Sequence, residues 1–207
     1  MNNNINKRLT FLEESKISHF NIVKILSGQV EPIDIYAFMV LKRSISLVFG
    51  FIELIRNKNL ICAAPLIRLQ IDNLLRFHAA FLVDNQSQFV VEVLQKKEVR
   101  KIKDRSGNYM SDIYLQDVLE SDYSWLKGTY KNTSGYIHLS DQHFFNTLRA
   151  SKSDRKGAVE IYIGPDDKMV SDEVYLGATE DMICVTHALL TFLGNWALTK
   201  NKSPDQQ

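Results

Sequence analysis

A polar stripe crosses one of the most apolar segments of the chain, residues 60–84. Arg68, Asp72 and Arg76 recur every four residues, so on a helix they lie on one face. Most other positions of the segment are Leu, Ile, Ala or Phe, which indicates a helix buried on most sides. Because burying an unpaired charge is costly, the stripe is predicted either to bind a neighbouring element or to line a cavity.

The composition is that of an ordinary globular protein. Of 207 residues, 45% are hydrophobic and 24% charged, and the net charge is +1. This charge gives no global reason to expect nucleic acid, a membrane surface or an acidic partner, so such binding requires a local patch.

Two features favour a cytoplasmic protein. Cys62 and Cys184 lie in apolar sequence and are expected to be reduced core thiols. The polar N-terminus has no signal-peptide pattern, and the apolar stretch 45–55 is too short to span a bilayer. No membrane partner is expected.

Apolar periodicity predicts a mainly α-helical fold, an antiparallel helical bundle forming one domain over residues 1–200, with a polar tail at 201–207. Asp34 is the expected N-cap of the second helix. A small β-hairpin insertion is expected near residues 144–163, where two short apolar runs flank a polar turn. Helices are predicted over residues 4–26, 34–56, from 60 through the polar stripe, 86–103, from 112 into the region of residue 130, and 171–199.

The short turn at 57–59 should fold the second and third helices into an antiparallel hairpin. In that register Gly50 lies opposite Arg68, and Ser46 lies opposite Asp72. Glu53 is expected to reach Arg68.

Arg43 approaches Arg76 in the same hairpin, which gives the stripe two interpretations. A guanidinium cluster in a cavity can hold a phosphate or carboxylate. Alternatively, Asp72 pairs with the arginines four residues before and after it and fixes the register. The structural interpretation is favoured, because one carboxylate and two arginines on a helix satisfy each other locally.

Residues 130–143 concentrate polar side chains. Ser134 and His138 share a face with Tyr130 if a helix continues through them, and His138 is then placed to act as a general base. The alternative is a helix end, whose side chains satisfy free backbone groups. Although His143 follows, two histidines with one nearby aspartate do not predict a metal site, and no cofactor is expected.

The basic run over residues 96–105 would form a positive helix face that attracts phosphates. No aromatic residue for base stacking lies between its basic residues, and two acidic residues dilute it, so a solvated face is favoured. Glycine-rich phosphate loops and the GxSxG, HExxH and CxxC motifs are absent from the sequence.

The order Arg68-x3-Asp72, then Tyr130-x3-Ser134-x3-His138, resembles that of HEPN-like bacterial helical bundle proteins over about residues 34–199. The resemblance implies a homodimer, a link to phage defence or toxin systems, and metal-independent RNA cleavage. The family's Arg-x4-6-His motif is absent, because no arginine is followed by a histidine at that spacing.

Two hypotheses follow. In the leading one, the protein binds or cleaves RNA or a nucleotide: His138 is the general base, and Arg68 and Arg76 hold the phosphate. Tyr130 and Ser134 orient the substrate. The expected binding residues are Asp72, Arg76, Arg43 and His143. In the alternative, the protein is a non-catalytic module that binds a protein partner or senses a small molecule.

Overall fold

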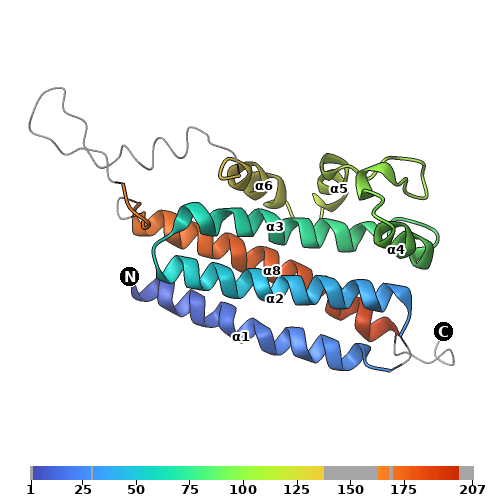
Figure 1. The fold of residues 1–207 in the computed structure, drawn as a ribbon, viewed down its shortest axis with the longest axis horizontal. Coiled ribbons are helices and arrows are strands. Elements are labelled where there is room, and N and C mark those ends of the chain that lie inside the picture. Colours follow the sequence, from blue (N-terminus) through green and yellow to red (C-terminus); the bar gives the residue numbers. More distant parts are fainter. Residues whose placement is uncertain (1, 29, 138–162, 168–169, 201–207) are drawn as a thin grey trace, which may run out of the picture.

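Four long helices form the body of the molecule. The structure, a computed structural model, describes residues 2–28, 30–137, 163–167 and 170–200. The four helices are α1 (Asn3–Leu26), α2 (Pro32–Arg56), α3 (Leu60–Ala79) and α8 (Asp172–Lys200). Both α1 and α3 pack against α2 and α8, so the four helices close around one core. In Figure 1, α1, α3 and α8 run in one direction and α2 runs in the other. The predicted helical bundle is confirmed.

The hairpin of α2 and α3 forms as expected, with two local differences in its turn and caps. Asp34 is not the N-cap of α2; it lies one turn inside the helix and accepts a hydrogen bond from the backbone N–H of Glu31 at 2.7 Å. After α2 ends, Lys58 takes a left-handed conformation with φ of 54°. The side chain of Asn59 then caps α3.

The connection from α3 to α8 includes three short helices, α4 (Gln86–Leu94), α5 (Asp112–Leu119) and α6 (Leu126–Ser134). Figure 1 shows α5 and α6 along the outer side of α3, and α4 packs against α2. The prediction of one helix over 86–103 is wrong, because Lys96 adopts a φ of 69° and only a 3-10 turn, Val99–Lys101, follows. The helix expected from 112 towards 130 is also interrupted, at 120–125, where residues that compete for backbone hydrogen bonds, such as Ser and Asp, are concentrated.

The predicted β-hairpin receives no support. Within the described ranges no residue forms a strand, and the β pairing there is an isolated antiparallel bridge between Lys103 and Tyr109. Of the hairpin positions, 144–162 lie outside the described residues, as does the expected tail at 201–207.

The cysteines are not core residues. Cys62 and Cys184 are both free, as expected, but both are exposed. Each lies on a helix of the bundle at a position that faces away from the core. Apolar neighbours in the sequence therefore did not mean burial, because the opposite side of the same helix carries the core residues.

Two of the described helices, α2 and α8, are long and apolar enough to cross a membrane by length and composition alone. The apolar window in α2 is longer than the stretch 45–55 suggested. Core helices of soluble bundles have the same properties, and both α2 and α8 pack against neighbouring helices here. A cytoplasmic location stays a prediction.

Candidate functional site

The polar stripe of α3 meets α5 at Asp112. Arg68 Nη2 lies 2.8 Å from Asp112 Oδ2, and Arg76 Nη2 lies 2.5 Å from Asp112 Oδ1. Arg76 also donates from Nε to Asp72 Oδ1 at 3.0 Å. Both oxygens of the Asp112 carboxylate therefore hold an arginine of α3, which fixes α5 against that helix.

Arg43 extends the set from α2. Its Nη1 donates to Asp72 Oδ2 at 2.8 Å and to Asn73 Oδ1 at 2.7 Å. We call Arg43, Arg68, Asp72, Arg76 and Asp112 the arginine–aspartate cluster. Its three arginines and two aspartates leave one positive charge in excess.

Tyr130 of α6 completes the contact with Asp112. Its hydroxyl donates to Asp112 Oδ2 at 2.9 Å and accepts from Arg68 Nη2 at 2.5 Å. The guanidinium carbon of Arg68 also lies 3.7 Å from the centroid of the Tyr130 ring, a cation–π contact. Burial and the bond to Asp112 raise the pKa of Tyr130, so its hydroxyl keeps its proton at neutral pH.

The charges of the cluster stabilise one another. Burial disfavours the ionised form of Asp112, but the Arg76 charge and the Tyr130 hydrogen bond outweigh it and lower the pKa of Asp112. Burial likewise opposes the charge on Arg76, while Asp72 and Asp112 raise its pKa. Asp112 and Arg76 therefore remain ionised together, as a paired network requires.

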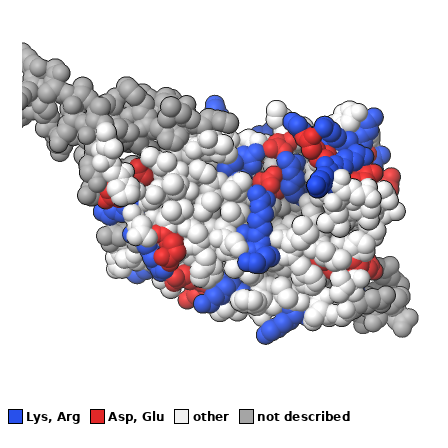
Figure 2. Space-filling model, viewed as in Figure 1, with Lys and Arg blue, Asp and Glu red and all other residues white. Residues whose placement is uncertain are grey.

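An open cleft of about 640 Å³ lies beside the cluster. We call it the Arg76 cleft; it is lined by Arg76, Glu98, Val99, Arg100, Ser111, Asp112, Ile113 and Tyr130. The Nη1 atom of Arg76 is buried and has no hydrogen-bond partner among the described residues. In Figure 2, charged side chains gather over α4 and α5, while much of the rest of the face over α2 and α3 is uncharged.

Some predicted contacts of the stripe are wrong. The carboxylate of Glu53 lies 3.3 Å from Arg56 and does not reach Arg68, because Arg68 is turned towards α5. Gly50 lies against Leu66, since a Cβ added to it would be 3.4 Å from the Leu66 Cδ1 atom. The stripe does not satisfy itself locally either: the pair Asp72–Arg76 is local, but Arg68 depends on α5.

The predicted face of Tyr130, Ser134 and His138 is not a continuous helix. The helix α6 ends at Ser134, whose hydroxyl donates to the Tyr130 carbonyl oxygen at 2.7 Å, and residues 135–137 form a turn. Ser134 therefore fits the helix-end interpretation. His138 and His143 lie outside the described residues. Among the residues that the structure describes, no group of three or more His, Cys, Asp or Glu side chains is placed to hold a metal.

The basic run over 96–105 is mostly a solvated surface, and not a helix face. Lys97 pairs with Glu92 at 2.7 Å, and Arg105 donates to the Phe81 carbonyl oxygen at 2.7 Å, beyond the end of α3. Of the basic residues in the run, Arg100 lines the Arg76 cleft.

A buried polar chain begins at His19, which the sequence did not single out. His19 Nδ1 lies 2.8 Å from the Ser15 carbonyl oxygen, and its Nε2 lies 2.9 Å from the Ser44 hydroxyl. Because a carbonyl only accepts, Nδ1 carries the proton, and the Ser44 hydroxyl donates to Nε2 in the neutral ring. Burial lowers the pKa of His19, which agrees with a neutral ring.

The same chain continues to the arginine–aspartate cluster. Gln70 donates to Ser44 at 2.7 Å and to Thr186 of α8 at 3.1 Å, and it accepts from Asn73 at 2.9 Å. Asn73 in turn accepts from Arg43. The sequence signal was present, since two amides three residues apart in an apolar helix share one buried face.

Comparisons with protein-family models, curated proteins and solved structures find no match for this chain.

Proposed function

We propose that this protein binds a phosphate group of RNA or of a nucleotide in the Arg76 cleft, with Arg76 and Arg100 as the cationic contacts. The observation that carries the proposal is Arg76 Nη1, a buried donor without an acceptor among the described residues, on a residue that lines the cleft. A guanidinium donor removed from water needs an acceptor, and phosphate oxygens match its planar geometry.

The surroundings of Arg76 agree with an anionic ligand. The cluster has one positive charge in excess, and Arg100 places an exposed guanidinium at the rim, where it is paired with Glu98. Ser111 lines the same cleft, and its hydroxyl, which accepts from the Tyr114 backbone, can still donate to a sugar or phosphate oxygen. A volume of about 640 Å³ accommodates a nucleotide-sized group.

The proposal concerns binding first. RNA cleavage without a metal would need a general base, and the expected base, His138, is outside the described residues. Tyr130 is held as a hydrogen-bond donor to Asp112. RNA cleavage and the homodimer, both implied by the HEPN-like resemblance, are therefore separate proposals, and each is tested by its own measurement.

Binding is tested with Arg100→Ala against Lys101→Ala. Both side chains pair with Glu98, but Arg100 lines the cleft and Lys101 does not, so the two variants lose the same charge at neighbouring positions. We expect Arg100→Ala to weaken binding of a fluorescent single-stranded RNA about threefold to tenfold. The slope of log K against log salt concentration should also become shallower by about the amount that one phosphate contact contributes. Lys101→Ala should stay close to wild type.

The outcomes distinguish RNA binding in the cleft from non-specific attraction of RNA to surface charge. Equal losses in the two variants would mean that surface charge, not the cleft, binds RNA, and an unchanged Arg100→Ala would reject the site. Incubating RNA with wild type and with folded His138→Ala tests cleavage: degradation by wild type alone supports a nuclease, whereas intact RNA leaves binding as the activity. Sedimentation of the same samples measures the dimer.

A further inference from the structure

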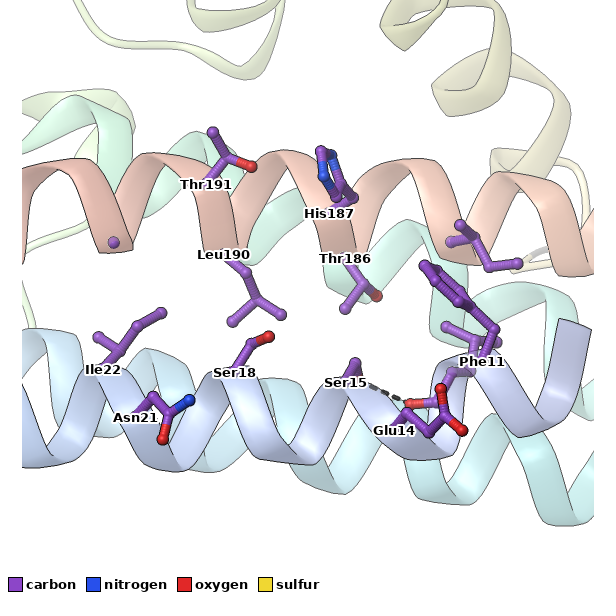
Figure 3. Close-up of a pocket in the computed structure, with 13 residues that line it drawn as sticks. Phe11, Glu14, Ser15, Ser18, Asn21, Ile22, Thr186, His187, Leu190 and Thr191 are labelled. Carbon is purple, nitrogen blue, oxygen red and sulfur yellow. Dashed lines mark hydrogen bonds between the residues drawn. The ribbon is translucent and has the colours of Figure 1, made fainter.

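A second hollow lies on another side of the bundle, between α1 and α8. This α1–α8 groove has a volume of about 430 Å³ and shares no lining residue with the Arg76 cleft. Figure 3 shows Ser18 and Ile22 of α1 across from Thr186 and Leu190 of α8, with Phe11 at one end. Gly194 of α8 lies beside Ile22 of α1, since an added Cβ would be 4.0 Å from the Ile22 Cδ1 atom.

The surface of the groove is apolar with a polar rim. Leu12, Ile22, Ile183 and Leu190 supply its apolar part. Hydroxyl, amide and imidazole groups from both helices also line it, at Ser15, Ser18, Asn21, Thr186, His187 and Thr191. A mainly apolar surface with a few polar groups, in a hollow of this size, is typical of sites for small organic molecules.

The charge of the groove selects the kind of molecule. Glu14 is the one Asp, Glu, Lys or Arg among the lining residues, and it has no ion pair within the described part of the chain. Phe11 lies one turn away on α1 with 55% of its surface exposed, and Figure 3 shows it next to Glu14 at the same end of the groove. A carboxylate beside an aromatic ring attracts an ammonium group by charge and by cation–π contact.

We propose that the α1–α8 groove binds a small organic cation, an amine with an apolar body. The ammonium group lies at Glu14 and Phe11, and the apolar body lies along Ile22 and Leu190. This site is separate from the proposed phosphate site, which selects the opposite charge, so either proposal can fail without the other.

The test uses two fluorescent probes with the same ring system and opposite charge. Dansylcadaverine carries a primary ammonium group, and dansylglycine carries a carboxylate. We expect dansylcadaverine to bind with a blue-shifted emission and dansylglycine to bind about fivefold more weakly or not at all.

Two variants assign the binding to the groove. Ser18→Phe adds bulk inside the groove at an exposed position, so it should weaken dansylcadaverine binding about tenfold or more. Ser87→Phe, the same exchange at an exposed position of α4, should leave binding unchanged and controls for added surface apolarity. Glu14→Gln should weaken the cation about threefold and abolish the preference between the two probes.

Each result decides the matter. The site is supported if the protein prefers the cationic probe and Glu14→Gln removes that preference. It also requires that Ser18→Phe loses binding while Ser87→Phe keeps it. Binding that Ser18→Phe leaves intact, a preference for dansylglycine, or no binding of either probe would overturn it. Circular dichroism of the variants confirms that the fold is retained.

Discussion

At Asp112, donors from two other helices converge on one carboxylate. Arg68 and Arg76 approach from α3 and Tyr130 from α6, so this side chain of α5 joins three elements. The side chain of Arg68 is only 12% exposed, which means that its charge depends on this partner. Removing the carboxylate leaves Arg68 without its ion-pair partner and Arg76 with Asp72 alone, whereas removing one arginine leaves Asp112 still paired.

Asp112→Asn is expected to lower the free energy of unfolding at pH 7 by about 1–3 kcal/mol, the range for a partly exposed charged network. The lowered pKa of Asp112 stabilises the fold above its unfolded value of about 3.9, and this contribution is lost as pH falls below that value. The difference between wild type and Asp112→Asn in urea unfolding should therefore narrow from pH 7 to pH 3.

Asp117→Asn is the matched control for that experiment. Asp117 lies on the same helix, but its side chain is 54% exposed and pairs with Lys127 at the surface. Its loss should have a much smaller effect. Equal effects of the two variants would show that Asp112 has no special role in holding α5.

The sequence predicted the stripe but not its main partner. Arg68, Asp72 and Arg76 were recognisable because a helix repeats every 3.6 residues, and the approach of Arg43 followed from a short turn. Asp112 lies 36 residues beyond Arg76, and the chain changes direction twice between them. Local periodicity gives no information on where such a distant segment packs against α3, so this contact could be identified only from the tertiary structure.

Among the elements, the long helices were predictable and the short ones were not. Each long helix carries a sustained apolar stripe, and Gly28 and Pro32 mark the break between α1 and α2. The end of α4 has no such signal, because a lysine, Lys96, occupies the left-handed position where glycine is usual. A residue with a side chain is about 1 kcal/mol less stable than glycine in this left-handed conformation.

Lys96→Gly should therefore raise the free energy of unfolding by about 0.5 kcal/mol, part of the strain being offset by the greater freedom of glycine in the unfolded chain. Gln95→Gly, one residue earlier at an ordinary φ of −79°, has no strain to relieve and should be destabilising. Thermal unfolding of the two variants measures the contrast. A loss of stability in both would mean that the left-handed residue is not strained.

For the molecule as a whole, the buried His19 and the partly buried His78 make stability depend on pH. Burial lowers the pKa of both His19 and His78. For His78, nearby Asp122 acts in the opposite direction but is outweighed. The unfolded chain then binds protons that the native state does not, so the free energy of unfolding should fall as pH decreases below about 6.5.

His78→Phe should reduce this slope by up to about 1.4 kcal/mol per pH unit, the value for one proton. Neither ring nitrogen of His78 has a hydrogen-bond partner in the described residues, and the ring lies 5.2 Å from Phe192, so an aromatic replacement suits the site. His19→Gln should instead lower stability even at pH 7.5, because it breaks the bond to Ser44. Urea unfolding between pH 5.5 and 7.5 compares them, and identical slopes in wild type and His78→Phe would refute the assignment.

The place of α8 in the bundle has a consequence for how the chain folds during synthesis. This helix packs against α1, α2 and α3, yet the ribosome produces it more than 90 residues after α3. Until α8 emerges, the apolar faces of the first three helices that it will cover remain open to water. The nascent chain therefore exposes an incomplete, aggregation-prone core while the residues between α3 and α8 are synthesised, and its folding is completed only by a contact between segments far apart in the sequence.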